Sequence, residues 1–273
     1  MKSFNLAKME SSLIDGQAHY KMGLENEKLD LNNLIGQDLR LIFKHQINCI
    51  HCFSVIKKSY SGGHCYPCSI KLAATDLCIL KPELCHYSKG TCREPLWGQS
   101  HCMVPHYVYL ANSSGLKVGI TRATQLPTRW IDQGAVAGLP IIKVSSRYQS
   151  GLFEKLISSE ISDKTDWRKM LKGSIDEIDL EEKRDELFEL FGESIDNMEA
   201  KLEAGAIEIL ENAEIVSISY PVLEYPLKVN SLSLDKNEVV GGKLLGIKGQ
   251  YLIFNTGVLN IRSHTGYKID LEY

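Results

Sequence analysis

All eight cysteines of the chain lie between Cys49 and Cys102. The first four form two Cys-x2-Cys pairs, Cys49 with Cys52 and Cys65 with Cys68, which are separated by twelve residues. Each short turn brings two sulfur atoms to one side, as a tetrahedral zinc ion with Zn–S bonds of about 2.3 Å requires. Disulfides suit small secreted domains, whereas this longer chain begins without the apolar run of an export signal. The pairs therefore predict a closed, structural zinc site in a reducing cytoplasm.

The other four cysteines predict a second metal site. Six, six and nine residues separate them in turn: Cys78, Cys85, Cys92 and Cys102. Four thiolates match the coordination number of one zinc ion, although His86 and His101 each adjoin a cysteine and leave the ligand set open. We expect one or two structural Zn2+ ions in a zinc-ribbon-like region, with unpaired buried thiols as the alternative. Because metal binding to such sites contributes ~10 kcal/mol or more to folding, removal of the metal should unfold this segment.

The elements that follow the cysteines predict a small α/β module. Alternating aromatic and β-branched residues at His106–Ala111, a turn, and Leu116–Thr121 are typical of a β-hairpin. A short helix at Pro127–Gly134 begins with proline and ends with glycine. A strand at Leu139–Ser145 and a helix at Leu152–Ile161 complete the order strand, strand, helix, strand, helix.

Two short motifs in this module resemble those of the GIY-YIG nuclease superfamily. V108-Y109-L110 followed by K117-V118-G119 is similar to its paired strand motifs, and F153-E154-K155-L156-I157 leading to D166-W167 resembles its glutamate helix and terminal motif. The resemblance covers Tyr107–Leu171. With the cysteines ahead of it, the chain is similar to an uncharacterised bacterial family that joins a cysteine-rich N-terminal region to a GIY-YIG-like module.

The resemblance implies divalent-metal-dependent hydrolysis of a phosphodiester. It assigns Tyr109 to the attacking water, Arg129 to the transferring phosphate with Arg122 as a competing candidate, and Glu154 to a single Mg2+ or Mn2+ ion. An oxygen-ligated metal and an arginine would neutralise the phosphate while a base deprotonates water. Since tyrosine has a pKa near 10, we expect Lys117 on the adjacent strand to lower the pKa of Tyr109.

Two positions depart from the superfamily pattern. Lys117 stands where tyrosine is usual, and Gln133 where several members have histidine. These departures favour a non-catalytic RNA- or DNA-binding module as the alternative to an endonuclease. A tRNA-modifying enzyme on the same fold is a third interpretation. Without the motif order, Tyr109 would be interpreted as a packed aromatic and Glu154 as a solvated helix residue.

Charge is distributed unevenly along the chain, whose net charge is -3. The stretch Gly36–Arg147 contains 13 Lys and Arg but 5 Asp and Glu, a basic front that favours nucleic acid through phosphate neutralisation. Two zinc ions, each held by four thiolates, would reduce the surplus to about +4. The basic residues expected to contact RNA or DNA are Lys117, Arg122, Arg129 and Arg147.

The C-terminal part of the sequence predicts a helix and then strands. Asp176–Glu214 holds fifteen acidic and three basic residues with apolar positions at helical spacing. We therefore expect an amphipathic helix or a helical hairpin, with Gly192 and Gly205 as candidate breaks. We expect its acidic face to be exposed to solvent. The alternatives are that it binds a partner, or that it covers the basic front when no nucleic acid is bound. Ile215–Tyr273 predicts a small antiparallel barrel or sandwich. Four of its residues are candidates for binding a single strand: Lys248, Tyr251, Phe254 and Arg262.

These patterns predict an α+β chain of five segments. They are an N-terminal segment with a lead-in strand (1–48), a zinc-binding module (49–106), the GIY-YIG-like module (107–172), the acidic helix (173–214) and a β-rich C-terminal unit (215–273). No window approaches the ~20 apolar residues that span a bilayer, so we expect a cytoplasmic protein without membrane contact. The oligomeric state stays open.

Overall fold

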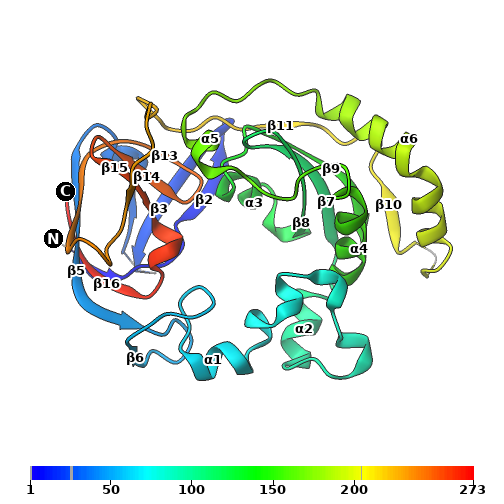
Figure 1. The fold of residues 1–273 in the computed structure, drawn as a ribbon, viewed down its shortest axis with the longest axis horizontal. Coiled ribbons are helices and arrows are strands. Elements are labelled where there is room, and N and C mark those ends of the chain that lie inside the picture. Colours follow the sequence, from blue (N-terminus) through cyan, green and yellow to red (C-terminus); the bar gives the residue numbers. More distant parts are fainter. Residues whose placement is uncertain (1, 25–26, 204) are drawn as a thin grey trace.

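The computed structural model describes residues 2–24, 27–203 and 205–273, and these form three β-sheets with short helices around them. The cysteine-rich segment is a separate lobe below the sheets in Figure 1. The expected mixed α+β fold, with its cysteine cluster in the N-terminal half, is thereby confirmed. Among the described residues, no helix has both the length and the apolar character needed to cross a membrane.

The largest sheet joins the two ends of the chain. Its eight strands follow the order β1-β16-β5-β13-β14-β15-β12, with β6 paired to β5. Lys2 pairs with Leu271 and Leu41 with Val240, so strands from the first 48 residues extend the C-terminal β unit. The strands are β1 (Lys2–Asn5), β5 (Asp38–Asn48), β6 (Val55–Ile56), β12 (Ser231–Leu232), β13 (Val239–Lys248), β14 (Tyr251–Phe254), β15 (Gly257–Asn260) and β16 (Tyr267–Glu272).

The second sheet belongs to the predicted α/β module, in the order β10-β9-β7-β8 with β11 paired to β9. The hairpin, short helix, strand and helix follow in the predicted order and are confirmed. The elements are β7 (His106–Asn112), β8 (Leu116–Arg122), α3 (Thr128–Asp132), β9 (Ala137–Val144), α4 (Arg147–Ile157), α5 (Trp167–Leu171), α6 (Leu180–Glu199), β10 (Ile207–Ile209) and β11 (Val216–Ser217).

Helix α4 begins at Arg147 rather than at the expected Leu152. Ser146 caps it: its Oγ accepts a hydrogen bond from Gln149 N at 3.4 Å, and Gln149 Oε1 accepts one from Ser146 N at 3.0 Å. This reciprocal capping box satisfies backbone N–H groups that the first turn would leave without partners. The earlier start brings Arg147 onto the same helix as Glu154.

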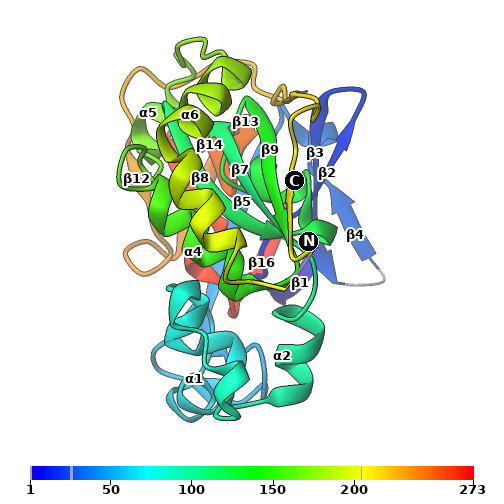
Figure 2. The same ribbon diagram turned by 90° about the vertical axis from the view of Figure 1, so that its right-hand side faces the viewer.

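Two hydrophobic clusters hold the sheets together. One packs Tyr109 and Trp130 of the module against the large sheet and against the third sheet. The other lies between the module strands and helices α4 and α6, which Figure 2 shows in front of those strands. Buried Leu187 and Phe191 confirm the amphipathic helix, which continues through Gly192. The third sheet consists of β2 (Glu10–Ile14), β3 (Gln17–Leu24) and β4 (Glu27–Asp30).

The cysteine lobe has short helical turns and little apolar burial. Its two α-helices are α1 (Tyr66–Lys71) and α2 (Pro95–His101), with 3-10 turns η2 (Ala73–Thr75), η3 (Leu77–Ile79), η4 (Pro82–Leu84) and η5 (Tyr87–Lys89). Leu80 and Leu96 are 82% and 83% exposed, so these large side chains do not build a core. The other 3-10 turns of the chain are η1 (Asn32–Leu34), η6 (Ala123–Gln125) and η7 (Ile261–His264).

The close pairing of β13 with β5 leads to a stability prediction. A Cβ at Gly241 would collide with the carbonyl oxygen of Leu39, which is backbone and cannot turn aside. We expect Gly241→Ala to lower the free energy of unfolding by about 2 kcal/mol, as overpacked sites do, in urea titrations. Gly192→Ala is the matched control, because among the described residues no atom lies within 4 Å of its added Cβ. Equal stability of both variants would contradict the prediction.

Candidate functional site

The first four cysteines converge on one point. The sulfur atoms of Cys49, Cys52, Cys65 and Cys68 all lie within 4.8 Å of one another. Cys52 Sγ is 3.8 Å from Cys65 Sγ, close to the separation of about 3.8 Å that two sulfurs take on a tetrahedron with bonds of about 2.3 Å. Backbone N–H groups of Cys65 and Cys68 donate to Cys49 Sγ at 3.2 Å and Cys65 Sγ at 3.4 Å. These four residues can hold a metal ion such as zinc.

The environment of Cys49 favours a thiolate. Burial acts to raise the pKa of this thiol, but hydrogen bonds from the backbone of Cys52, Cys65 and His51 outweigh it and lower the pKa to about 6. A thiol must lose its proton to ligate zinc. The backbone therefore prepares one ligand of the site for the metal.

The other four cysteines line one small cavity of about 10 Å³. That volume is close to the space that a single water-sized probe occupies, so the cavity has room for one ion. Burial, then neighbouring Asp76 and Cys85, raise the pKa of Cys78 to about 11. Polar and sulfur-bearing residues lining the cavity are Asp76, Cys78, Cys85, His86, Cys92 and Cys102.

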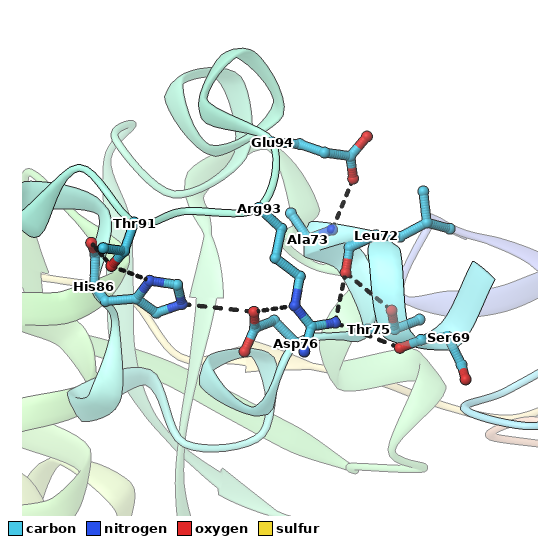
Figure 3. Close-up of polar contacts among 9 residues, drawn as sticks. All are labelled: Ser69, Leu72, Ala73, Thr75, Asp76, His86, Thr91, Arg93 and Glu94. Atoms are coloured by element: carbon cyan, nitrogen blue, oxygen red, sulfur yellow. Dashed lines mark hydrogen bonds and ion pairs between the residues drawn. The ribbon is translucent and has the colours of Figure 1, made fainter. Parts of the chain in front are cut away.

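Within this cavity, Asp76, Cys78 and His86 also form a group whose ligand atoms lie within 4.8 Å of one another. The carboxylate of Asp76, however, is engaged by Arg93, whose Nε lies 2.6 Å from Asp76 Oδ2 (Figure 3). His86 Nε2 is 3.5 Å from the same oxygen. His101 stacks on Trp97 instead, with ring centroids 4.2 Å apart. The sulfur atoms of Cys85, Cys92 and Cys102 do not join this group, so a second site with four thiolates stays a prediction from the sequence.

Arg93 also links the two cysteine clusters. Its Nη1 donates to the carbonyl oxygen of Leu72 at 3.2 Å, at the end of the helix that carries Cys68. Glu94 next to it accepts from Ala73 N at 2.7 Å (Figure 3). These hydrogen bonds connect the segments that carry the two clusters, so the clusters belong to one lobe and are not independent units.

A polar pocket of about 420 Å³ lies between this lobe and the module. It brings together four of the residues that the sequence predicted for phosphate and metal binding: Arg122, Arg129, Arg147 and Glu154. The structure adds Arg262 from the C-terminal unit and Asp163 after α4, while Ile79, Leu80 and Pro82 of the cysteine lobe form a wall. No local pattern signals Asp163 or this wall, and Arg262 had been considered only for binding a single strand. We call this the arginine pocket.

The second cysteine cluster positions Arg147 in this pocket. Arg147 N donates to the carbonyl oxygen of Cys102 at 2.8 Å, and its Nη2 donates to that of Ile79, next to Cys78, at 2.7 Å. A Cβ at Gly151, one turn later, would collide with Pro82. Helix α4 is therefore seated directly on the cysteine segment, and a change in that segment would displace the helix.

Glu154 lies on α4, as Arg147 does, and is close to Arg129 of α3. Partial burial raises its pKa, and the neighbouring guanidinium groups of Arg129 and Arg147 oppose this. A carboxylate in this setting is an oxygen ligand for a hard divalent cation, which usually keeps several waters and takes further ligands from substrate phosphates. The described residues of helix α6 do not line the pocket, so the acidic helix does not cover it in this conformation.

Tyr109 is completely buried beside the pocket instead of lining it. Burial raises its pKa, and Arg129 offsets this only in part. Lys117, which we expected to lower the pKa, is not among the groups that do, and the net shift is upward. Its hydroxyl donates to Gln133 Oε1 at 3.1 Å. With its amide turned over, Gln133 bridges Tyr109 to Arg129, accepting from Arg129 Nε at 3.1 Å. The ring of Tyr109 lies over Gly119 on the paired strand β8, and a Cβ added at Gly119 would collide with that ring.

Lys117 is buried under the pocket floor. Its Nζ donates to the carbonyl oxygen of Asp163 at 3.0 Å and lies 3.4 Å from Thr165 Oγ1. Burial, followed by the charge of Arg129, lowers its pKa to about 8. Among the C-terminal candidates for strand binding, Lys248 and Phe254 are buried and Tyr251 stacks on Trp167, so Arg262 alone is exposed.

Fold and site together define an α+β protein with a cationic pocket and a four-cysteine cluster that can hold a metal ion. The chain belongs to the family described as "Protein of unknown function (DUF2797)", whose model matches residues 36–269. That match includes both cysteine clusters and every residue of the arginine pocket. Comparisons with curated proteins and with solved structures found no match.

Metal removal is expected to unfold the cysteine lobe while the sheets remain folded, because the lobe lacks an apolar core. After chelation of the full-length chain, peptides from 49–102 should lose protection from hydrogen exchange and those from β7 and β9 should keep it. Added Zn2+ should restore the protection. A chain verified as metal-free that keeps the lobe protected would contradict the assignment.

The depressed pKa of Lys117 predicts a pH-dependent stability. Between pH 8 and its ordinary pKa of 10.5, the unfolded chain binds this proton more tightly, so stability rises with pH. Relative to Lys117→Met, the wild type should gain up to about 3 kcal/mol across that window. Urea unfolding at several pH values, with zinc present, measures the difference. A difference that does not change with pH would show that Lys117 is not desolvated.

Proposed function

We propose that this protein hydrolyses phosphodiesters of RNA or DNA, in a divalent-metal-dependent reaction at a GIY-YIG-like site in the arginine pocket. The observation that carries the proposal is the convergence of four arginines, from β8, α3, α4 and η7, around Glu154. Glu154 and Asp163 balance only part of this charge, and the like charges that remain repel each other in a partly desolvated site. A phosphate group supplies the missing negative charge.

The arginines have distinct roles in this proposal. Arg129, which Gln133 orients, holds the non-bridging oxygens of the phosphate, and Arg147 stabilises the charge that develops on them. Arg122 and Arg262 hold neighbouring phosphates. Mg2+ or Mn2+ at Glu154 would polarise the phosphate and lower the pKa of a bound water.

Tyr109 and Lys117 act from beneath the pocket. The hydroxyl of Tyr109 supports Gln133 and through it Arg129, and Lys117 fixes the backbone at Asp163. Both are positioning residues here, because neither lines the pocket. Lys117 therefore contributes to nucleic-acid binding only through the pocket floor.

Zinc in both cysteine clusters would be structural, since four thiolates leave no open coordination position. Zinc at the first cluster would fix the two Cys-x2-Cys turns. Zinc at the second would fix the backbone of Ile79 and Cys102, to which Arg147 donates hydrogen bonds. Two such ions would leave catalysis to the cation at Glu154. The zinc lobe would then be a scaffold for the pocket.

The second candidate is a module that binds RNA or DNA without cleaving it. The burial and raised pKa of Tyr109 favour it, because a general base must reach water and lose its proton. Binding without cleavage at any concentration of Mg2+ or Mn2+ would select this candidate.

The glutamate provides a direct test of hydrolysis. Glu154→Gln should reduce Mg2+- or Mn2+-dependent cleavage of RNA or DNA oligonucleotides at least 100-fold, because the amide is a poor ligand for a hard cation. Binding of the same oligonucleotides without divalent metal should persist. Glu160→Gln is the matched control, since Glu160 is exposed just after α4 and outside the pocket. Equal cleavage by wild type and Glu154→Gln would remove the assigned site.

A further inference from the structure

The loop between the two zinc-binding pairs exposes aromatic side chains. Phe53 and Tyr60 are 73% and 37% exposed, and Tyr66 at the start of α1 is 59% exposed. Tyr60 and Tyr66 meet edge to face with ring centroids 5.6 Å apart, and Lys58 Nζ lies 5.4 Å from the centre of the Tyr60 ring. Neither the coordination of zinc nor a core accounts for these rings.

This loop is firmly held. Ile47 of β5 pairs with Ile56 of β6, and Tyr60 and His64 exchange two backbone hydrogen bonds of 2.8 Å. At Gly63 the chain runs so close to Thr265 of the C-terminal unit that a Cβ would touch that side chain. The exposed rings therefore project from a loop that backbone hydrogen bonds and packing hold in place beside η7.

A second polar pocket, of about 470 Å³, lies between the loop and η7. Lys57, Lys58 and Arg262 line it, together with Asp235, whose carboxylate accepts a hydrogen bond from Tyr267 Oη at 2.7 Å. Arg262 also lines the arginine pocket. Arg262 thus lines both pockets. Basic side chains therefore extend from Lys57 and Lys58 of the loop, through Arg262, to the pocket that contains Glu154.

We propose that this surface binds a single-stranded stretch of nucleic acid. Unpaired bases stack on Phe53 and Tyr66, and the backbone passes Lys57, Lys58 and Arg262 before it enters the arginine pocket. Stacking on exposed rings requires bases that are free of a duplex, and a cationic groove that follows the backbone is the usual companion of such rings. The inference rests on the proposed function and gives its substrate class: nucleic acid with unpaired nucleotides next to the phosphodiester in the pocket.

The test measures fluorescence anisotropy of labelled oligo-U and oligo-dT and of duplexes of equal length, with full-length zinc-loaded protein and no added divalent metal. Phe53→Ala and Tyr66→Ala should each weaken single-strand binding about tenfold. Tyr273→Ala removes an exposed tyrosine away from both pockets and should bind as wild type does. Unchanged zinc content of each variant shows that the lobe remains folded.

The role of Arg262 has its own signature. Each phosphate contact on a single strand contributes about 0.7 to the slope of log affinity against log salt. Arg262→Gln should reduce that slope by about this amount, whereas Arg168→Gln, which alters an exposed arginine on α5 outside both pockets, should leave it unchanged.

The outcomes separate this inference from hydrolysis. Loop variants that bind as tightly as wild type, or tighter binding to duplex than to single strands, would overturn the inference and leave hydrolysis standing. Loss of binding in the loop variants, with no cleavage by the wild type under any divalent-metal condition, would support the inference and refute hydrolysis. A wild type that binds no oligonucleotide would overturn both.

Discussion

Residues 49–102 bury little apolar surface, so the convergence of cysteine sulfurs is the constraint on which the shape of this lobe, and of the pocket that it walls, depends. Large side chains such as Leu80 and Leu96 point to solvent, while the sulfurs of the first cluster converge within 4.8 Å. The lobe also links β5 of the large sheet to β7, the first strand of the module. The convergence of the sulfurs and the main hydrophobic cluster therefore hold those two parts in register together.

The arginine pocket is the clearest consequence of that register. Arg122 and Arg129 come from the module, Arg262 comes from the C-terminal unit, and Ile79 comes from the cysteine lobe. Arg147 contacts backbone carbonyl groups next to Cys78 and at Cys102, so its guanidinium depends on the second cluster. Four guanidinium groups from the module and the C-terminal unit outnumber the two carboxylates of the pocket, Glu154 and Asp163. This surplus of positive charge is the basis for proposing a phosphate as the ligand.

The hairpin shows how one motif position can serve packing and function together. Tyr109 faces Gly119 and meets Trp130 edge to face with ring centroids 5.9 Å apart, so its ring is part of the main core. Its hydroxyl nevertheless reaches Gln133, and Gln133 reaches Arg129. A side chain that desolvation keeps protonated is a poor base but a rigid support, which agrees with a positioning role at the edge of the pocket.

The sequence by itself determined the features that depend on neighbours along the chain. The spacing of Cys49, Cys52, Cys65 and Cys68 predicted their convergence, and alternation and turn residues predicted the β7–β8 hairpin, because short loops leave few geometries. Only the tertiary structure decided which distant residues meet: β5 with β13 and β16, Arg262 with Arg122, and Tyr109 with a closed core instead of solvent. A local periodic pattern shows that one face of a strand is buried, but it does not show which distant strand or face packs against it.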